Sequence, residues 1–155
     1  MPRLFVDDRI VITRGSVTFA AGTTGAIAQH TVFTITGMVA FGFFARCPTA
    51  GDLTSGGAAT ISFGTPTTVE YFILAEAVTA IDAGDFITPA GSVWGTSVNN
   101  FDTTNGLLTH VSSGTDIISN IAAFTVTGGV LEYYLFWTPI SVGATVALGS
   151  ELTAL

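Results

Sequence analysis

Apolar and polar residues alternate over short stretches along most of this chain. In one such stretch the apolar positions are Val32, Phe33, Ile35, Met38, Val39, Phe41 and Phe43. Alternation in segments dominated by Thr, Val, Ile and Phe is typical of β-strands rather than helices. The pattern predicts strands at residues 9–19, 31–36, 38–46, 59–63, 69–77, 86–87, 92–94, 107–111, 116–124 and 130–139.

Turn residues separate these segments and indicate how the strands are connected. Asn105-Gly106 predicts a two-residue hairpin, because a type I′ turn needs positive φ at both positions. Gly128-Gly129 predicts a similar link between the last two strands, and Gly37 indicates a bulge or bend. So many short strands within 155 residues predict an all-β fold, a single-domain jelly-roll-like β-sandwich over residues 9–155. Residues 1–8 precede it as an extended N-terminal arm.

The last predicted strand is apolar on both faces. One face holds Leu131, Tyr133, Leu135 and Trp137, and the other holds Val130, Glu132, Tyr134 and Phe136. In a sandwich only one face of a strand meets the core. The second apolar face therefore predicts a cover, which is either a loop of this chain or another subunit.

The charged residues are few and unevenly placed. They make up 10% of the chain, against about 25% in an average soluble domain, so we expect much of the surface to be hidden against partners. Lys is absent, all four Arg lie within the first 46 residues, and nine of the 11 carboxylates follow them. A net charge of −7 repels phosphate, so we expect no binding of nucleic acid or of an anionic membrane.

Neither a membrane span nor a signal peptide is predicted. Residues 15–45 carry no formal charge, but Gln29-His30 divides this stretch and its alternation favours strands over a helix. Asp7-Asp8-Arg9 interrupts the apolar start of the chain, so we expect synthesis in a cytoplasm without a leader.

No pattern of residues predicts catalysis. Cys47 is the only cysteine and is interpreted as a small apolar filler, while His30 and His110 lie far apart and are interpreted as structural or surface residues. Asp82 and Asp85 lack the further ligands of a calcium loop and favour a turn with side-chain hydrogen bonds. Without a Gly-x-Ser-x-Gly elbow or a paired metal motif, we expect a protein that is not an enzyme and holds neither cofactor nor metal.

Several stretches of the second half resemble small virion structural proteins of tailed bacteriophages, of the head decoration (capsid cement) type. They are Thr79-Ala80-Ile81-Asp82-Ala83-Gly84-Asp85, Thr115-Asp116-Ile117-Ile118 and residues 126–141, and the similarity covers about residues 60–142. These motifs are strand and turn patterns and transfer no site residue.

The resemblance implies a small β-rich protein that binds the outside of a phage head and stabilises contacts between major capsid proteins. It also implies a homo-oligomer, expected to be a trimer, on the virion. Arg3, Arg9 and Arg14 are then candidates for bonds to acidic groups of the shell. Tyr134, Phe136 and Trp137 are candidates for a subunit interface, or for the core.

Two alternatives remain open at this point. The first is a tail, fibre or spike component, whose composition would be the same. The second is a carbohydrate-binding jelly-roll module in which Trp94, within a polar segment rich in Gly, Ser, Thr and Asn, forms an aromatic platform.

Overall fold

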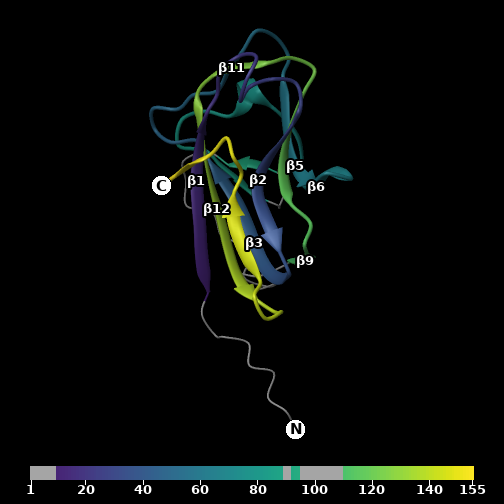
Figure 1. Cartoon of the computed structure of the whole chain (residues 1–155). Coiled ribbons are helices and arrows are strands. Elements are labelled where there is room, and N and C mark those ends of the chain that lie inside the picture. Colours follow the sequence, from purple (N-terminus) through teal and green to yellow (C-terminus); the bar gives the residue numbers. More distant parts are fainter. Residues whose placement is uncertain (1–9, 89–91, 95–109) are drawn as a thin grey trace.

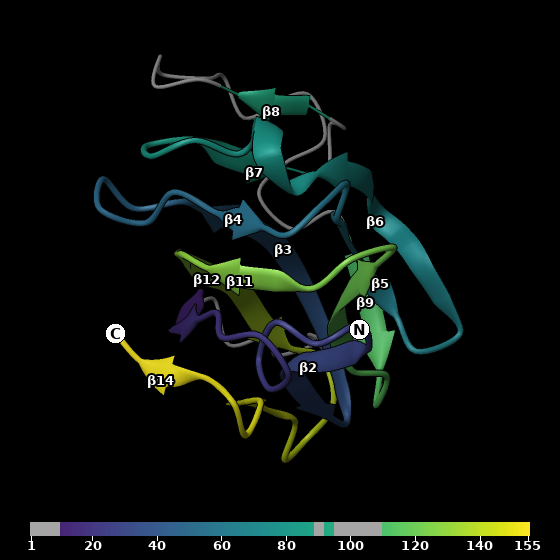
Figure 2. The same cartoon turned by 90° about the horizontal axis from the view of Figure 1, so that it is seen from above.

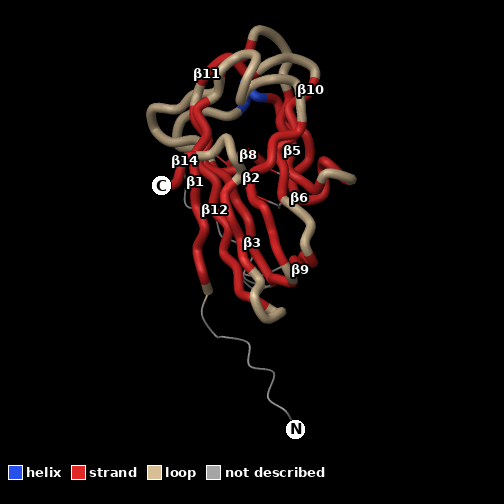
Figure 3. The backbone as a smooth tube through the Cα atoms, viewed as in Figure 1, coloured by secondary structure: helices blue, strands red, loops and turns tan. Residues whose placement is uncertain are grey.

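The computed structural model of the chain describes residues 10–88, 92–94 and 110–155, and its regular secondary structure consists almost entirely of β-strands joined by loops (Figure 3). The helical content described is a single 3₁₀ turn at Val78–Ala80. The strands are β1 Val11–Thr18, β2 Gln29–Thr36, β3 Met38–Arg46, β4 Thr54–Ser55, β5 Thr60–Thr65, β6 Thr68–Ala77, β7 Phe86–Thr88, β8 Ser92–Trp94, β9 His110–Ser113, β10 Ile117–Ala122, β11 Val126–Gly128, β12 Val130–Pro139, β13 Thr145–Leu148 and β14 Thr153–Ala154. The predicted all-β class is confirmed.

Two antiparallel sheets form the body of the molecule. The seven-stranded sheet has the order β14-β1-β12-β3-β7-β8, with β9 also paired to β3, and the five-stranded sheet has the order β13-β2-β10-β5-β6. Figure 1 shows the long strands β1, β12 and β3 side by side in one layer with β2 in the other layer. Figure 2 shows the same arrangement from above, with β4 and β11 as a separate pair. The predicted β-sandwich is therefore observed.

Aromatic side chains join the two sheets. Phe43 of β3 lies 6.3 Å from Phe33 of β2 and 5.4 Å from Phe63 of β5, measured between ring centroids. Tyr133 of β12 lies 5.9 Å from Phe63 and is only 1% exposed. This burial raises the pKa of the Tyr133 phenol far above its ordinary value, so the hydroxyl stays protonated in the core.

Gly37 makes the bend that the sequence predicts. Its φ is +73°, a left-handed conformation that favours glycine, and it directs the chain from β2 in one sheet to β3 in the other. The bend is tight, because a Cβ atom here would lie 2.8 Å from Ser141 Oγ.

The prediction for Gly128-Gly129 is wrong. These glycines do not close a hairpin, because β10 pairs with β2 and β5 whereas β12 pairs with β1 and β3. Gly129 has φ +102° and carries the chain from one sheet to the other. Its backbone passes so close to that of Asp52 that a Cβ atom would lie 2.4 Å from the Asp52 carbonyl oxygen. The predicted Asn105-Gly106 hairpin and the predicted arm lie outside the described residues.

Candidate interaction surface

β12 is the strand that is apolar on both faces. Its side chains that point away from the core lie on the outer face of the seven-stranded sheet. In β12, Leu131, Tyr133 and Leu135 are buried in the core, whereas Tyr134 and Phe136 point outward and are half-buried. The register places Arg14 of β1 opposite Tyr134 and Ile12 opposite Phe136. On the opposite edge of β12, Phe44 of β3 is the register partner of Tyr134. Because residues directly opposite in a ladder point to the same face, all of these side chains share one surface.

Aromatic rings pack against each other on this outer face. The ring of Phe44 is stacked on that of Tyr134, with a centroid distance of 4.7 Å and an interplanar angle of 7°. It also lies 5.8 Å from Phe136 and 6.0 Å from Phe86. We call Phe44, Phe86, Tyr134 and Phe136 the outer aromatic cluster. Clusters of this kind supply the large, rigid apolar area that characterises the centre of protein interfaces.

A small polar network borders the outer aromatic cluster. The Tyr134 hydroxyl donates a hydrogen bond of 2.9 Å to Glu132 Oε2, and Arg46 Nη1 lies 3.5 Å from the same oxygen. Burial raises the pKa of the Tyr134 phenol, and the hydrogen bond to the Glu132 carboxylate adds to this shift. The Arg46 guanidinium also lies 5.8 Å from the centroid of the Phe86 ring. Its buried Nε has no hydrogen-bond partner within the described part of the chain.

The start of β1 extends this surface with exposed apolar residues. Ile12, and Ile10 just before the strand, are 53% and 47% exposed, although isoleucine is normally buried. By contrast, the outward residues of β2 in the other sheet are the exposed Thr34 and Thr36. The five-stranded sheet also exposes Tyr71 and Leu74 of β6. The packed aromatic cluster distinguishes the outer face of the seven-stranded sheet, which is therefore the candidate interaction surface.

The structure separates the three predicted interface residues. Tyr134 and Phe136 belong to the outer aromatic cluster, but Trp137 lies on the inner face, is 8% exposed and is part of the core. Its indole N–H donates to Thr13 Oγ1 at 2.9 Å, so its polar atom is satisfied inside the molecule. Of the two places proposed for Trp137, the core is the one observed.

The predicted arginines and Trp94 are only partly described. Arg14 is exposed on β1, beside the outer aromatic cluster, whereas Arg3 and Arg9 lie outside the described residues. Trp94 belongs to β8, where its backbone pairs with that of Phe86, and its side chain lies outside what the structure describes.

Phe44, Phe86, Arg46 and Ile12 belong to this surface but were not predicted as site residues. Alternation in β3 indicates that Phe44 points away from Phe41 and Phe43, which is the one available signal. Phe86 and Arg46 join the surface through the pairing of β7 with β3, which places them opposite each other. Pairing between segments so far apart cannot be derived from the local pattern of either one.

Cys47 has the properties of a core residue. Its side chain is fully buried, and its thiol donates to the Gly51 carbonyl at 3.2 Å. Burial, together with the nearby carboxylates of Asp52, Asp85 and Asp82, raises the pKa of the thiol to about 11. A thiol in this state is protonated at neutral pH, and the interpretation of Cys47 as a filler agrees with this position.

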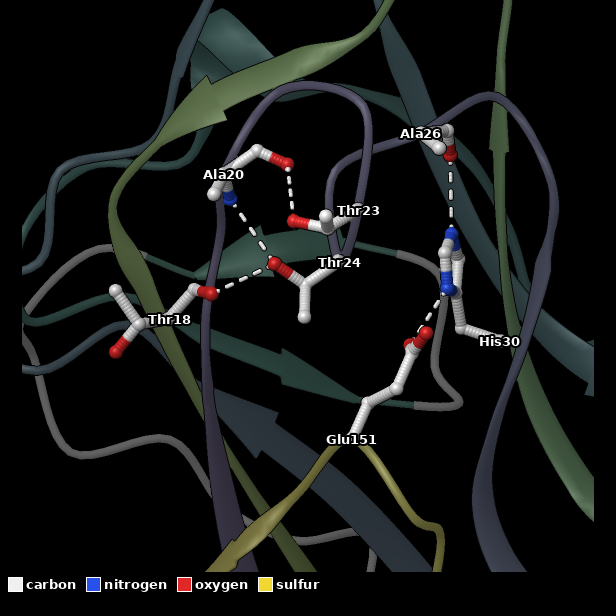
Figure 4. Close-up of polar contacts among 7 residues, drawn as sticks. All are labelled: Thr18, Ala20, Thr23, Thr24, Ala26, His30 and Glu151. Atoms are coloured by element: carbon white, nitrogen blue, oxygen red, sulfur yellow. Dashed lines mark hydrogen bonds and ion pairs between the residues drawn. The ribbon is translucent and has the colours of Figure 1, made fainter.

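His30 is a structural histidine, as expected. One ring nitrogen, Nδ1, lies 2.7 Å from Glu151 Oε2 and the other, Nε2, lies 3.0 Å from the Ala26 carbonyl oxygen (Figure 4). The neighbouring Gly22–Gly25 stretch is a turn held by Thr24, whose hydroxyl donates to the Thr18 carbonyl at 2.8 Å and accepts from the Ala20 N–H at 3.0 Å (Figure 4). Both hydrogen-bonding groups of His30 thus serve the connection between β1, β2 and the C-terminal segment.

Asp82 and Asp85 form the predicted turn. The Asp85 carboxylate accepts the backbone N–H of Asp82 at 2.9 Å, and the Asp85 N–H donates to the Asp82 carbonyl at 3.1 Å. The described residues contain no cluster of three or more His, Cys, Asp or Glu side chains that could hold a metal ion. They also contain no helix long and apolar enough to cross a membrane.

Comparisons with known proteins give one structural likeness. No family model and no curated protein matches the chain. A chain of the capsid asymmetric unit of cyanophage Pam1 is similar at 15% sequence identity, over 84% of this chain and 85% of that chain, with a TM-score of 0.42. A likeness of this extent carries no argument about function.

Proposed function

We propose that this protein is a structural component of a tailed-phage virion, a decoration (cement) protein that binds the outside of the head and stabilises contacts between major capsid proteins. The observation that carries the proposal is the outer face of the seven-stranded sheet, where Phe44, Phe86, Tyr134 and Phe136 form an aromatic cluster beside the exposed Ile12 and Arg14. The resemblance of residues 60–142 to such proteins and the low content of charged residues support it.

The proposed mechanism is the burial of this face against the assembled shell. Apolar area removed from water stabilises the contact, while Arg14 at its border forms charge-assisted hydrogen bonds with carboxylates of the capsid. Because the protein binds the assembled head and not the free capsid subunits, its binding energy stabilises the head by mass action. We further propose that the protein has no enzymatic activity, forms a trimer and is made in the host cytoplasm.

We also propose the jelly-roll topology for the sandwich. Numbered along the chain, the eight strands β1, β2, β3, β5, β6, β7, β10 and β12 lie in the order 1-8-3-6 in one sheet and 2-7-4-5 in the other. Repeated alternation of the chain between two four-stranded sheets is the pattern of two interlocked Greek keys, which supports this assignment.

The function is tested by co-sedimentation of the purified protein with heads assembled without it. We expect wild-type protein to sediment with heads. Phe136→Ser should lose about thirtyfold in affinity, since removal of a central aromatic anchor costs about 2 kcal/mol or more. Ile12→Ser, at a more exposed position, provides a second variant should Phe136→Ser unfold. Thr34→Ala, on the opposite outer face, is the matched control and should bind like wild type.

Two results would contradict the proposal. One is a folded wild-type protein that does not bind heads at all. The other is binding that is unchanged in both Phe136→Ser and Ile12→Ser, whatever the result for Thr34→Ala. Labelling this protein on intact virions shows where it lies on the particle. A signal confined to the tail would mean that it is a tail component and not a head decoration protein.

A further inference from the structure

A groove opens on the side of the sandwich where the two sheets part. It lies between the first half of β6, the turn before it, and β9, and has a volume of about 410 Å³. Small-molecule sites span roughly 300–1,000 Å³. The groove is separate from the outer aromatic cluster, since it opens between the two sheets and shares none of the cluster's residues.

Four of the residues that line this groove, Phe41, Tyr71, Phe72 and His110, have aromatic rings. His110 is stacked on Phe41 with a centroid distance of 5.4 Å, and its ring is 4.9 Å from that of Phe72. Tyr71 packs edge-on against Phe72 at 5.1 Å yet remains 62% exposed. The Tyr71 ring also lies 6.2 Å from that of His110, so two ring contacts position it, although most of its surface faces water.

Apart from Val111, the rest of the described lining consists of residues with hydroxyl groups. Thr67, Thr68, Ser113 and Thr115 are exposed along the rim. The turns that carry them are fixed from within, because Thr65 Oγ1 accepts the Thr68 N–H at 3.1 Å and Ser112 Oγ accepts the Thr115 N–H at 3.1 Å. Each hydroxyl can both donate and accept a hydrogen bond, so the rim suits a ligand that presents hydroxyls of its own.

The groove is uncharged although the protein carries a net charge of −7. The described lining contains no Asp, Glu, Lys or Arg. Its one titratable group near neutral pH is His110, and burial lowers the pKa of this imidazole, which keeps it neutral at pH 7. An anionic ligand would find no cation here, and a cationic ligand would find no carboxylate.

From this combination we propose that the groove between β6 and β9 binds a neutral saccharide, with one sugar ring against Tyr71 and His110 and its hydroxyls on the Thr67, Thr68 and Ser113 rim. Sugar rings have an apolar face of C–H groups and an edge of hydroxyls, and the groove offers the complement of both. The proposed site does not depend on attachment to a phage head.

The test is a titration of ¹⁵N-labelled protein, followed by amide NMR. The probes are neutral saccharides (glucose, galactose, N-acetylglucosamine and their disaccharides), with sialic acid as an anionic probe and a short neutral Gly-Ser peptide as a non-sugar probe. We expect a neutral saccharide to shift the amides of residues 67–72 and 110–113. Tyr71→Ala should weaken its binding by about tenfold, the effect of losing one stacked ring.

Leu74→Ala is the matched control, because Leu74 is 61% exposed on the same strand and does not line the groove. It should bind like wild type. Tyr71→Phe, which keeps the ring, should retain most of the affinity. The proposal is overturned if no neutral saccharide shifts these amides, if Tyr71→Ala and Leu74→Ala bind alike, or if sialic acid or the peptide binds more tightly than every neutral sugar.

Discussion

Arg14 on β1 and Tyr134 on β12 are register partners that project from the same face of the seven-stranded sheet. This pairing places an exposed cation beside the outer aromatic cluster. Two features that the sequence suggested separately, a basic N-terminal part and a two-faced apolar strand, thereby become parts of one surface.

The position of Arg14 predicts an electrostatic contribution to head binding. Arg14→Ala should weaken binding by no more than about fivefold at low ionic strength, as for an exposed ion pair, and the difference should disappear at high salt. The Arg14→Ala variant should fold like the wild type, because the Arg14 side chain is exposed. Co-sedimentation with heads at two salt concentrations measures this, and equal binding of wild type and Arg14→Ala at low salt would remove Arg14 from the contact.

Phe44 stabilises the fold as well as the surface. It contacts Phe86, Tyr134 and Phe136 and is only 9% exposed, so Phe44→Ala should lower the free energy of unfolding by about 3 kcal/mol. The control is Val142→Ala, at a fully exposed position, with an expected change within about 0.5 kcal/mol. Urea denaturation measures both, and similar values for the two variants would mean that the aromatic contacts contribute nothing to stability.

Cys47 should be unreactive in the native protein. With a buried side chain and a thiol pKa of about 11, it presents almost no thiolate to an aromatic disulfide reagent at pH 8. Reaction should be complete within seconds in denaturant and slower by orders of magnitude without it. Rapid labelling of the native protein would show that the segment around Cys47 is open in solution.

His110 should make stability depend on pH. Its pKa is lower in the folded protein than the value of 6.5 for a free imidazole, so the unfolded chain binds the proton more readily. The contribution of neutral His110 to the free energy of unfolding is therefore complete above about pH 6.5, and it is lost as the pH falls through the pKa of His110 in the folded protein. His110→Phe removes this imidazole and should reduce the loss of thermal stability between pH 7 and pH 5. His30 and the carboxylates are common to the wild type and the variant, so the difference between the two proteins reports on His110. Parallel stability curves for the two proteins would exclude this role.

Gly129 should tolerate no side chain. Gly129→Ala combines an unfavourable φ of +102° with a clash against the Asp52 carbonyl, whereas Gly22→Ala has a φ of +79° and open space around the new methyl. The Gly22 variant should lose about 1 kcal/mol from backbone strain alone, and the Gly129 variant clearly more. Chemical denaturation of both measures the difference, and equal losses would show that the approach to Asp52 relaxes without cost.

The longer strands could be predicted from the sequence because each carries its own signal. The predicted segments 38–46, 92–94 and 130–139 coincide with β3, β8 and β12, and most others differ by one to three residues at their ends. The short strands β4, β11, β13 and β14 were missed. They lie at the edge of a sheet or in the separate β4–β11 pair, and they are strands because a partner lies beside them.

Pairing and burial depth could not be predicted locally. Gly128-Gly129 has the sequence of a hairpin turn but connects strands of different sheets, since the partners of β12 come from residues 11–18 and 39–46. Trp137 and Phe136 are adjacent and similarly apolar, yet one lies in the core and the other outside. Alternation separates the two faces of β12, but only the position of the five-stranded sheet decides which face is inner.

The central claim is that the outer aromatic cluster is the surface buried on a phage head. Oxidative footprinting of the free protein and of the protein bound to heads tests it most directly, read at the half-buried Tyr134 and Phe136 and compared with Tyr71 on the other sheet. The account predicts that Tyr134 and Phe136 become protected on binding while Tyr71 keeps its reactivity. Bound protein in which the cluster remains as reactive as in the free state would contradict it.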